Sequence, residues 1–464
     1  MKLTFVLSII ALAVLSSCGS IKPEAPEIVV EENYEIPKAE PSYIKIPIKI
    51  NLKPYFDETD NGIDRTFIGE ESQCSGVSIK YHFNRDPIKF EGKGSKLNFD
   101  VDGKYRLWLN YCAACSDMFS SEEYCLTSRV YASCGVGEPM RKIHVGYETK
   151  IGVAKDFKLK SETKLRTIKA LSPCKITVFN YDATSRLETE VEAVLKDLEK
   201  DIDKEISAID LRPDMEATWE VMNEPIDLEG YGFLELRPKY IAMDDIVYKG
   251  DTAYFNAVLK AYPRILSQES GRKVKPLPNL STYRDRDGFD INMNVYSRYD
   301  SLSNILTRNV AGTELEVKGK TVIFDSIQIY GANNKQLHIK INFSGSKSGE
   351  VYLTGTPVFV ADSQFISFPD LEFDVKSKSA LLKSAKWFFD KKITNMLRQE
   401  TEIDLSPYMD TLREELNKNL AMELDEGVNM SGKVEEITIE MIQPRGDQLH
   451  IQLHSLGKLE IVMD

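Results

Sequence analysis

The sequence predicts an α+β protein made of two tandem units in an elongated molecule. In each unit a highly curved antiparallel sheet is expected to wrap around one long amphipathic helix. Three observations predict this fold class. Strand-like runs that alternate apolar and polar residues fill most of the chain, and each half contains one long helical pattern with a broad apolar stripe. A short motif also recurs after each of these helices at a constant offset.

The first eighteen residues have the pattern of a bacterial export signal. Lys2 precedes an apolar run over 3–15, which is shorter than the about 20 residues that a resident membrane helix needs. The run ends in Leu15-Ser16-Ser17-Cys18, which resembles the lipobox of bacterial lipoproteins, where the cysteine thiol receives the lipid. We therefore expect residues 1–18 to be a lipoprotein signal, and acyl chains on Cys18 to hold the mature protein to a membrane.

The charge of the chain restricts its partners. The formal net charge is −13, so a nucleic acid is not expected to bind, because its phosphates would be repelled. The same charge argues against a basic face that docks on a membrane, although local patches remain compatible with it. No later apolar run is long enough to span a bilayer as a helix.

The N-terminal part of the mature chain begins with a predicted flexible tether. Residues 19–41 contain four prolines and many glutamates, a composition that disfavours a packed core. An alternating strand follows at 43–50. Because proline cannot donate to a β-ladder, Pro47 predicts that this strand is an edge strand or is bulged there.

The predicted N-terminal unit spans 42–266. Its strands are interrupted by a cysteine-rich insertion near 110–140, and a long helix is expected at 185–207 with a shorter one at 213–222. The polar, turn-rich residues 267–287 form the predicted linker to the next unit.

The predicted C-terminal unit spans 288–464 and repeats this order. Helices are expected at 301–309, 380–399 and 407–424, between alternating strands. Ile209-Asp210-Leu211-Arg212-Pro213 and Ile403-Asp404-Leu405-Ser406-Pro407 each follow a long helix and precede the next one. In each copy the aspartate is expected to cap the following helix, in whose first turn proline is tolerated.

The apolar stripes of the two long helices are the candidate lining of a ligand cavity. A twisted sheet around a helix that does not fill it leaves an elongated apolar space, and a filled core is the alternative. The candidate lining residues are Leu187, Val191, Leu195, Leu198, Ile202, Leu381, Ala385, Phe388, Phe389 and Met396.

Six cysteines remain besides the lipidated one. An even number in an exported chain favours disulfides, while four clustered thiolates that bind zinc, or free or redox-active thiols, are the alternatives. Two cysteines on strands that flank the insertion, Cys74 and Cys174, are candidates for a separate bridge, but spacing does not decide the pairing. The disulfide candidates are Cys74, Cys112, Cys115, Cys125, Cys134 and Cys174.

Motifs of known catalytic sites are missing from the sequence. The five histidines stand outside any His-Glu-x-x-His pattern, and neither a Gly-x-Ser-x-Gly elbow nor a phosphate-binding glycine loop occurs. We therefore expect no enzymatic activity, no metal and no cofactor.

Several strand and turn motifs resemble those of a family of long bacterial lipoproteins classified as a domain of unknown function. The match extends over nearly the whole mature chain, except the segment from Cys112 to Cys134. The motifs are Ser42-Tyr-Ile-Lys-Ile-Pro-Ile-Lys-Ile50, Gly232-Phe-Leu-Glu-Leu-Arg-Pro-Lys239, Gly349-Glu-Val-Tyr-Leu-Thr-Gly-Thr-Pro357, Leu371-Glu-Phe-Asp-Val375 and Ala385-Lys-Trp387.

That family is, more distantly, similar to tubular lipid-binding proteins of the bactericidal/permeability-increasing type, which hold lipid in an apolar groove. The resemblance implies an outer-membrane lipoprotein that binds or transfers a lipid or other hydrophobic ligand, since no aspartate follows Cys18. The first alternative is a structural lipoprotein with filled cores, whose disulfide-stapled insertion binds a partner of unknown identity. The second is a glycan-binding or hydrolytic surface protein.

Overall fold

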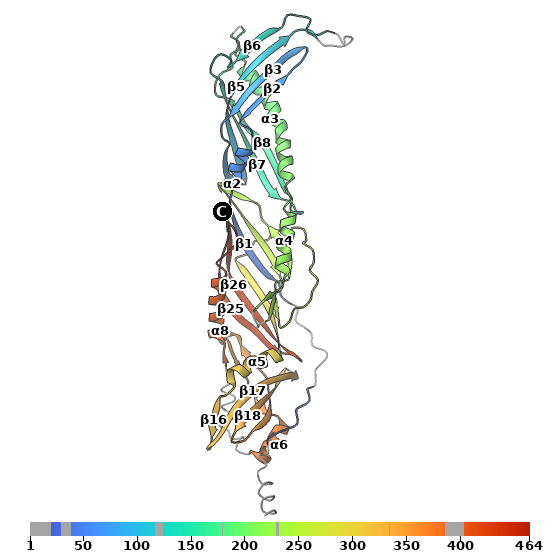
Figure 1. The fold of residues 1–464 in the computed structure, drawn as a ribbon, viewed down its shortest axis with the longest axis vertical. Helices are drawn as coiled ribbons and strands as arrows, with labels where there is room; N and C mark the ends of the chain where they lie inside the picture. Colours follow the sequence, from blue (N-terminus) through green and yellow to red (C-terminus); the bar gives the residue numbers. More distant parts are fainter. Residues whose placement is uncertain are drawn as a thin grey trace, which may run out of the picture.

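The computed structural model shows an elongated α+β molecule, as predicted (Figure 1). The strands of the described part form one large sheet over most of its length, a five-stranded sheet at one end and a three-stranded sheet. No described helix is long and apolar enough to cross a membrane. The structure describes residues 20–28, 39–116, 124–178, 180–228, 232–333, 335–385 and 403–464.

The end of the large sheet that bears the cysteines is called the distal end. Its long strand β5 pairs with β3 and β4 along one edge and with β6 and β7 along the other, while β8 pairs with β7. The elements are α2 (Lys53–Gly62), β2 (Thr66–Glu71), β3 (Gly76–Arg85), β4 (Lys89–Gly94), β5 (Lys96–Cys112), β6 (Val130–Cys134), β7 (Arg141–Val153), β8 (Leu159–Ala170) and α3 (Thr184–Ser207).

The middle of the molecule continues the same sheet with strands from both halves of the sequence. Strand β1 pairs with β13, and β26 joins β15 to β25. The elements are β1 (Ser42–Asn51), α4 (Arg212–Asn223), β9 (Ile226–Asp227), β10 (Phe233–Glu235), β11 (Pro238–Met243), β12 (Val247–Gly250), β13 (Thr252–Ala261), β14 (Arg264–Leu266), β15 (Phe289–Arg298), α8 (Ser406–Asn419), β24 (Met422–Asp425), β25 (Val428–Pro444) and β26 (Gln448–Met463).

The opposite end holds the two smaller sheets and is called the proximal end. Strands β16, β17, β18 and β19 follow one another as antiparallel neighbours, and β22 joins β19. The elements are α5 (Tyr299–Val310), β16 (Glu314–Val317), β17 (Lys320–Asn333), β18 (Gln336–Gly345), β19 (Gly349–Gly355), β20 (Val358–Val360), η1 (Ala361–Ser363), β21 (Phe365–Ser367), β22 (Glu372–Phe373), α6 (Val375–Ser384) and β23 (Ile403–Asp404).

Strand β1 is not an edge strand, although Pro47 predicts one. On one side β1 pairs with β13 along its whole length. On the other side it pairs with the start of β15 up to residue 44, and with β26 only from residue 48. The amide of Lys45 donates to the carbonyl of Gly288 on that second side at 3.0 Å, and Pro47 faces the same way because direction alternates along a strand. Pro47 therefore lies between the end of the pairing with β15 and the start of the pairing with β26, where no backbone donor is required. This place is called the Pro47 fork.

Helices α3, α4 and α5 agree with the sequence pattern within a few residues, and α8 starts where it is expected but ends five residues early. Helix α6 starts at Val375 and ends at Ser384, whereas the sequence predicts a long helix at 380–399, of which residues 386–399 lie outside the described part. Helix α2 was not predicted, although Pro54 in its first turn and Gly62 at its end are recognised helix boundary signals. The two aspartates predicted as caps take equivalent places, each one residue before the N-cap residue, which is Leu211 or Leu405. Asp210 accepts the amide of Arg212 at 3.0 Å, and Asp404 accepts the amide of Ser406 at 2.9 Å.

The described part of the predicted tether is packed against the proximal end. Ile21 is only 2% exposed and lies in a cluster with Phe343 and Leu381. Its amide donates to the carbonyl of Ser348 at 3.0 Å, and its carbonyl accepts the amide of Glu350 at 2.8 Å. The free edge of β19 gains a short strand-like partner in this way, so residues 20–28 differ from the flexible segment that their composition predicts.

The predicted linker is also packed. Leu277 is 6% exposed and lies in a cluster with Trp219 of α4, whose indole N–H donates to the carbonyl of Lys275 at 2.8 Å. Since β15, β25 and β26 share the large sheet with β1 and β13, the described strands do not divide into separate sheets at this segment.

Candidate functional site

One apolar surface of the distal end faces α3 and is called the inner face. Odd-numbered side chains of β5 point into it, whereas even-numbered ones such as Asp100 and Asp102 carry polar contacts on the other side. Cross-strand pairing extends the surface onto β3 and β7. Its residues are Ile79, Tyr81, Phe83, Phe99, Tyr105, Leu107, Leu109, Tyr111, Val145, Tyr147 and Ile168.

Helix α3 is fastened along the edge strand β8 by carboxylates. Glu188 accepts the amide of Ala170 at 2.7 Å, Glu199 accepts that of Leu165 at 2.7 Å, and Asp203 accepts that of Thr163 at 3.2 Å. These bonds satisfy edge amides that would otherwise seek another strand. Burial opposes ionisation of Asp203, but hydrogen bonds from Ser161 and Thr163 outweigh it and lower its pKa.

The apolar stripe of α3 does not enter a closed core. None of its 24 residues is buried. Leu187, Val191, Leu195 and Ile202 are half-buried, and Leu198 is 42% exposed. Leu187 packs against the cluster that contains Tyr105 and Leu107 of the inner face, while the rest of the stripe lies along the edge of the sheet and is half-buried or exposed.

A row of aromatic rings crosses the inner face. Phe56 of α2 stacks on Phe90 at 4.5 Å between ring centroids, Phe90 meets Phe99 at 6.3 Å, and Phe99 stacks on Tyr147 at 5.1 Å. The hydroxyl of Tyr147 donates to the carbonyl of Leu195 in α3 at 3.0 Å. Burial raises the pKa of Tyr147 to about 12, so it stays a neutral donor. The row thus joins α2, the sheet and α3.

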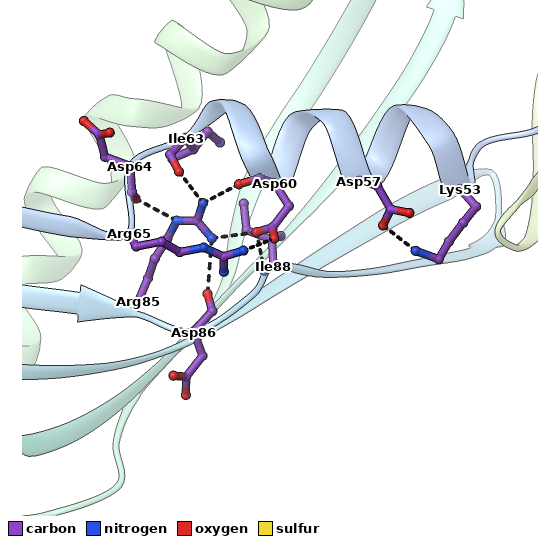
Figure 2. A network of polar contacts seen from close by, with 9 residues as sticks. All are labelled: Lys53, Asp57, Asp60, Ile63, Asp64, Arg65, Arg85, Asp86 and Ile88. Carbon is purple, nitrogen blue, oxygen red and sulfur yellow. Dashed lines mark hydrogen bonds and ion pairs between the residues drawn. The ribbon is translucent and has the colours of Figure 1, made fainter.

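Arg85 clamps the end of α2 onto the sheet (Figure 2). Its guanidinium donates to the Asp60 carboxylate at 2.6 Å and to the carbonyls of Ile63 and Asp64 at 2.5 and 2.9 Å. The Asp60 carboxylate also accepts the amide of Ile88 at 2.8 Å. Burial opposes ionisation of Asp60, but these hydrogen bonds and the nearby arginine charge lower its pKa. The clamp fixes the helix that carries Phe56.

Three disulfides close the distal end. The pairs are Cys74–Cys115, Cys112–Cys125 and Cys134–Cys174. Cys74 and Cys174 therefore bond to partners in the insertion and not to each other. The Cys134–Cys174 bond lies in the same packed cluster as Tyr105 and Leu107 of the inner face.

Large side chains near these disulfides are exposed to solvent. They include residues of β5 and β6 and of the loop between them, with exposed fractions from 46% to 69%. These residues are Tyr111, Tyr124, Leu126, Val130 and Tyr131.

A second concave feature lies at the Pro47 fork. A surface cavity of about 460 Å³ is lined by residues of β1, β25 and β26, among them Pro47, Gly432 and Leu459. Lysines 45 and 458 at this cavity already have carboxylate partners, Asp285 at 2.8 Å and Glu435 at 3.6 Å. The cavity is remote from α3 and is not the apolar space that the helical stripe predicts.

The family of the chain follows from its sequence over almost the whole length. Residues 40–462 match the model of a family described as Domain of unknown function (DUF4403). The chain belongs to this family. The resemblance predicted from the strand and turn motifs is thus confirmed. No curated protein matches this DUF4403 chain.

Solved structures similar to the DUF4403 chain are distant in sequence. One is the crystal structure of lipopolysaccharide binding protein, with a TM-score of 0.25, 10% identity, and coverage of 92% of this chain and 99% of that chain. Two others are of P47 from Clostridium botulinum E1 and A2. Both are 11% identical and cover 89% of this chain, with TM-scores of 0.20 and 0.22 and coverage of 98% and 96% of those chains.

The structure separates the predicted lining residues of the DUF4403 chain into groups. Five of them, from Leu187 to Ile202, border the inner face on α3, whereas Leu381 and Ala385 are 0% and 1% exposed in a packed cluster of the proximal end. Outside the described residues lie Cys18, Phe388, Phe389 and Met396.

Sequence reasoning missed the carboxylates that hold α3. Glu188, Glu199 and Asp203 are spaced by 11 and 4 residues, which places them within about 60° of one another around a helix of 3.6 residues per turn. That spacing was a usable signal for a line of acceptors facing one strand.

Proposed function

We propose that this protein is a non-enzymatic lipoprotein of the outer membrane that binds a lipid or another hydrophobic molecule on its inner face. The observation that carries the proposal is α3, a 24-residue amphipathic helix with no buried residue, beside a sheet surface of aromatic and aliphatic side chains. Acylation of Cys18 would hold the protein to the membrane that supplies such a ligand.

The free energy gained by burying apolar groups on the inner face is large enough for binding. Each methylene group removed from water contributes about 0.8 kcal/mol, so about ten methylenes on the inner face would contribute roughly 8 kcal/mol before the costs of ordering. The aromatic row and the stripe of α3 would contact the chain of the ligand.

We further propose that the two halves are tandem copies of one unit, as the offset motif predicts. Two local features support this. Helices α4 and α8 start in the same way after Asp210 and Asp404. Met215 of α4 and Met409 of α8 lie in two different clusters that both contact Ile44 of β1, so the two motifs meet at one strand.

Native mass spectrometry of the chain from Gly19 onward, purified without detergent, tests ligand binding. Co-purifying lipid or another apolar molecule is expected. The change Val191→Glu, on the half-buried side of α3, should remove most of it, whereas Val194→Glu, at a position 64% exposed, should not. If neither the parent chain nor Val194→Glu carries any apolar molecule, including after incubation with phospholipid, the proposal is wrong.

A second candidate function is protein binding through the distal end. The exposed Tyr124, Leu126 and Tyr131 beside the disulfides favour it, because exposed aromatic clusters commonly form the centre of interfaces. Under this alternative, changing these three residues to serine abolishes capture of one defined envelope protein while the lipid content stays unchanged.

A further inference from the structure

The start of the described chain marks one end of the molecule. Ile21 is bonded to the first residues of β19, and Glu24 forms an ion pair with Lys376 of α6 at 3.0 Å. Cys18 is three residues before Ile21 in the sequence, and three residues of extended chain span at most about 11 Å. An acyl anchor on Cys18 would therefore attach the protein by its proximal end, where α6 and β16 lie opposite β5 and β6 (Figure 1).

Two lysine-bearing turns meet at the same place. The turn between β16 and β17 carries Lys318 and Lys320, and the turn between β18 and β19 carries Lys347. The turns are adjacent, because the amide of Ser346 donates to the carbonyl of Thr321 at 2.8 Å. Lys22, next to Ile21, adds a fourth lysine at this edge and is exposed like Lys318 and Lys320, whereas Lys347 is half-buried.

Helix α6 adds three more positive charges. Its ten residues include three lysines and no acidic residue. Leu381 faces the packed cluster at 0% exposure, while Val375 and Leu382 are 77% and 53% exposed. An exposed surface that mixes lysines with a few apolar side chains is typical of elements that lie at the interface of a bilayer.

We name these lysines the anchored-end patch. Carboxylates also lie near it: Glu24 is paired with Lys376, Asp374 caps the start of α6, and Glu314 and Glu316 lie on β16. The net charge of the whole chain is −13, but charges beyond about 8 Å are largely screened at physiological salt. The patch consists of Lys22, Lys318, Lys320, Lys347, Lys376, Lys378 and Lys383.

We propose that the anchored-end patch binds an anionic phospholipid surface and so sets the orientation of the protein on its membrane. The proposal rests on the lipid anchor of the proposed function, since the anchor brings this end to the bilayer. The acyl chains and the lysines strengthen each other's binding to the membrane, because the acyl chains hold the lysines close to its surface. The distal disulfides then point away from the membrane.

Vesicle co-sedimentation of the chain from Gly19 onward tests the patch without the anchor. Vesicles of phosphatidylcholine with phosphatidylglycerol should bind the protein, pure phosphatidylcholine should not, and added salt should release it. The triple change Lys318→Gln, Lys320→Gln and Lys347→Gln should weaken binding roughly a hundredfold, at about 1 kcal/mol per lysine. All three lie in or beside the turns between β16 and β17 and between β18 and β19.

A matched control removes three charges from the distal end instead. Lys80→Gln, Lys104→Gln and Lys142→Gln change exposed lysines of β3, β5 and β7 and should leave vesicle binding unchanged. Equal loss in both triple variants would show a general charge effect, and binding of the parent chain to pure phosphatidylcholine would show apolar adsorption; either result overturns the proposal. The co-purifying lipid is measured separately, so a failure of the patch and a failure of the inner face give different results.

Discussion

The two ends of the molecule combine the same parts, a curved sheet and an amphipathic helix, with opposite results. At the proximal end α6 places Leu381 in a cluster with Val322, Phe343 and Leu353, all 2% exposed or less. At the distal end α3 is more than twice as long, yet none of its residues is buried. An apolar stripe therefore shows which side of a helix faces the sheet, but not whether the space between them is filled.

The difference lies in how each helix is attached. The contacts of α6 lie within the packed cluster, and the hydroxyl of Ser377 accepts the amide of Tyr352 at 2.8 Å. By contrast, α3 is attached by carboxylates to the edge of β8. Helix α6 is thus held by packing over its sheet, whereas α3 is held largely by polar contacts at a sheet edge.

The largest expected effect on stability concerns Arg85, which holds α2 against the sheet of the distal end. Arg85→Ala removes a donor from the half-buried Asp60 carboxylate and from the carbonyls of four nearby residues, and should lower the free energy of unfolding by roughly 4 kcal/mol. Chemical denaturation measures this. Arg65→Ala, which removes a more exposed partner of the same carboxylate, is the control and should cost under about 1 kcal/mol.

Truncation of one leucine in each helix tests the comparison directly. Leu381→Ala should destabilise the protein by about 3 kcal/mol, because it leaves a cavity in a packed cluster. Leu195→Ala, on the half-buried stripe of α3, should cost less than about 1 kcal/mol. Equal costs, measured by the same denaturation curves, would show that the inner face is as filled as the proximal core.

Acid should destabilise the part of the large sheet around β26 before it weakens the attachment of α3 to β8. His450 is 1% exposed, and burial together with the nearby Arg445 charge lowers its pKa to about 4. Since an unfolded histidine binds its proton near pH 6.5, stability is complete above that pH and falls by up to about 3 kcal/mol as the pH drops to about 4.

Hydrogen exchange at several pH values measures this order. Amides of β26 should lose protection between pH 6.5 and 4, and His450→Gln should flatten that response. The pKa of Asp203 is lowered, so its contribution is lost only below its ordinary value of 3.8. If the amides of β8 lose protection first, the assignment of the acid-sensitive region is wrong.

The smallest expected effect is at the attachment of α3 itself. Asp203→Leu removes the acceptor for the Thr163 amide and the Ser161 hydroxyl and should cost about 1 kcal/mol. Faster exchange of the Thr163 amide, with unchanged exchange at Ala170, would place the loss at this bond. Asp201→Leu, at an exposed position of the same helix, is the control.

Much of the fold could be predicted from periodicity. The strand over β1, the helices α3, α4 and α5 and the two aspartate caps agree within a few residues, because alternation and helical spacing are local properties. Helix α2 was missed because its apolar stripe is short, although Pro54 and Gly62 mark its ends. The pairing of the cysteines could not be predicted, since it depends on which strands become neighbours.

The candidate site could be predicted only on the helix side. The stripe from Leu187 to Ile202 was found by spacing, but the aromatic row from Phe56 to Tyr147 depends on cross-strand register. Whether Leu381 borders an open space or a filled one depends on Ile21, which is 360 residues away in sequence and packs into the same cluster. No local pattern carries that information.

The hydrogen bonds from the amides of β8 to the carboxylates of α3 also limit how α3 can move. If α3 swung away to admit a ligand, it would bare a row of unpaired amides on a 12-residue strand, the kind of edge that templates polymerisation of one chain on another. Helix α3 therefore cannot both protect the edge of β8 from pairing with another chain and move away from that edge.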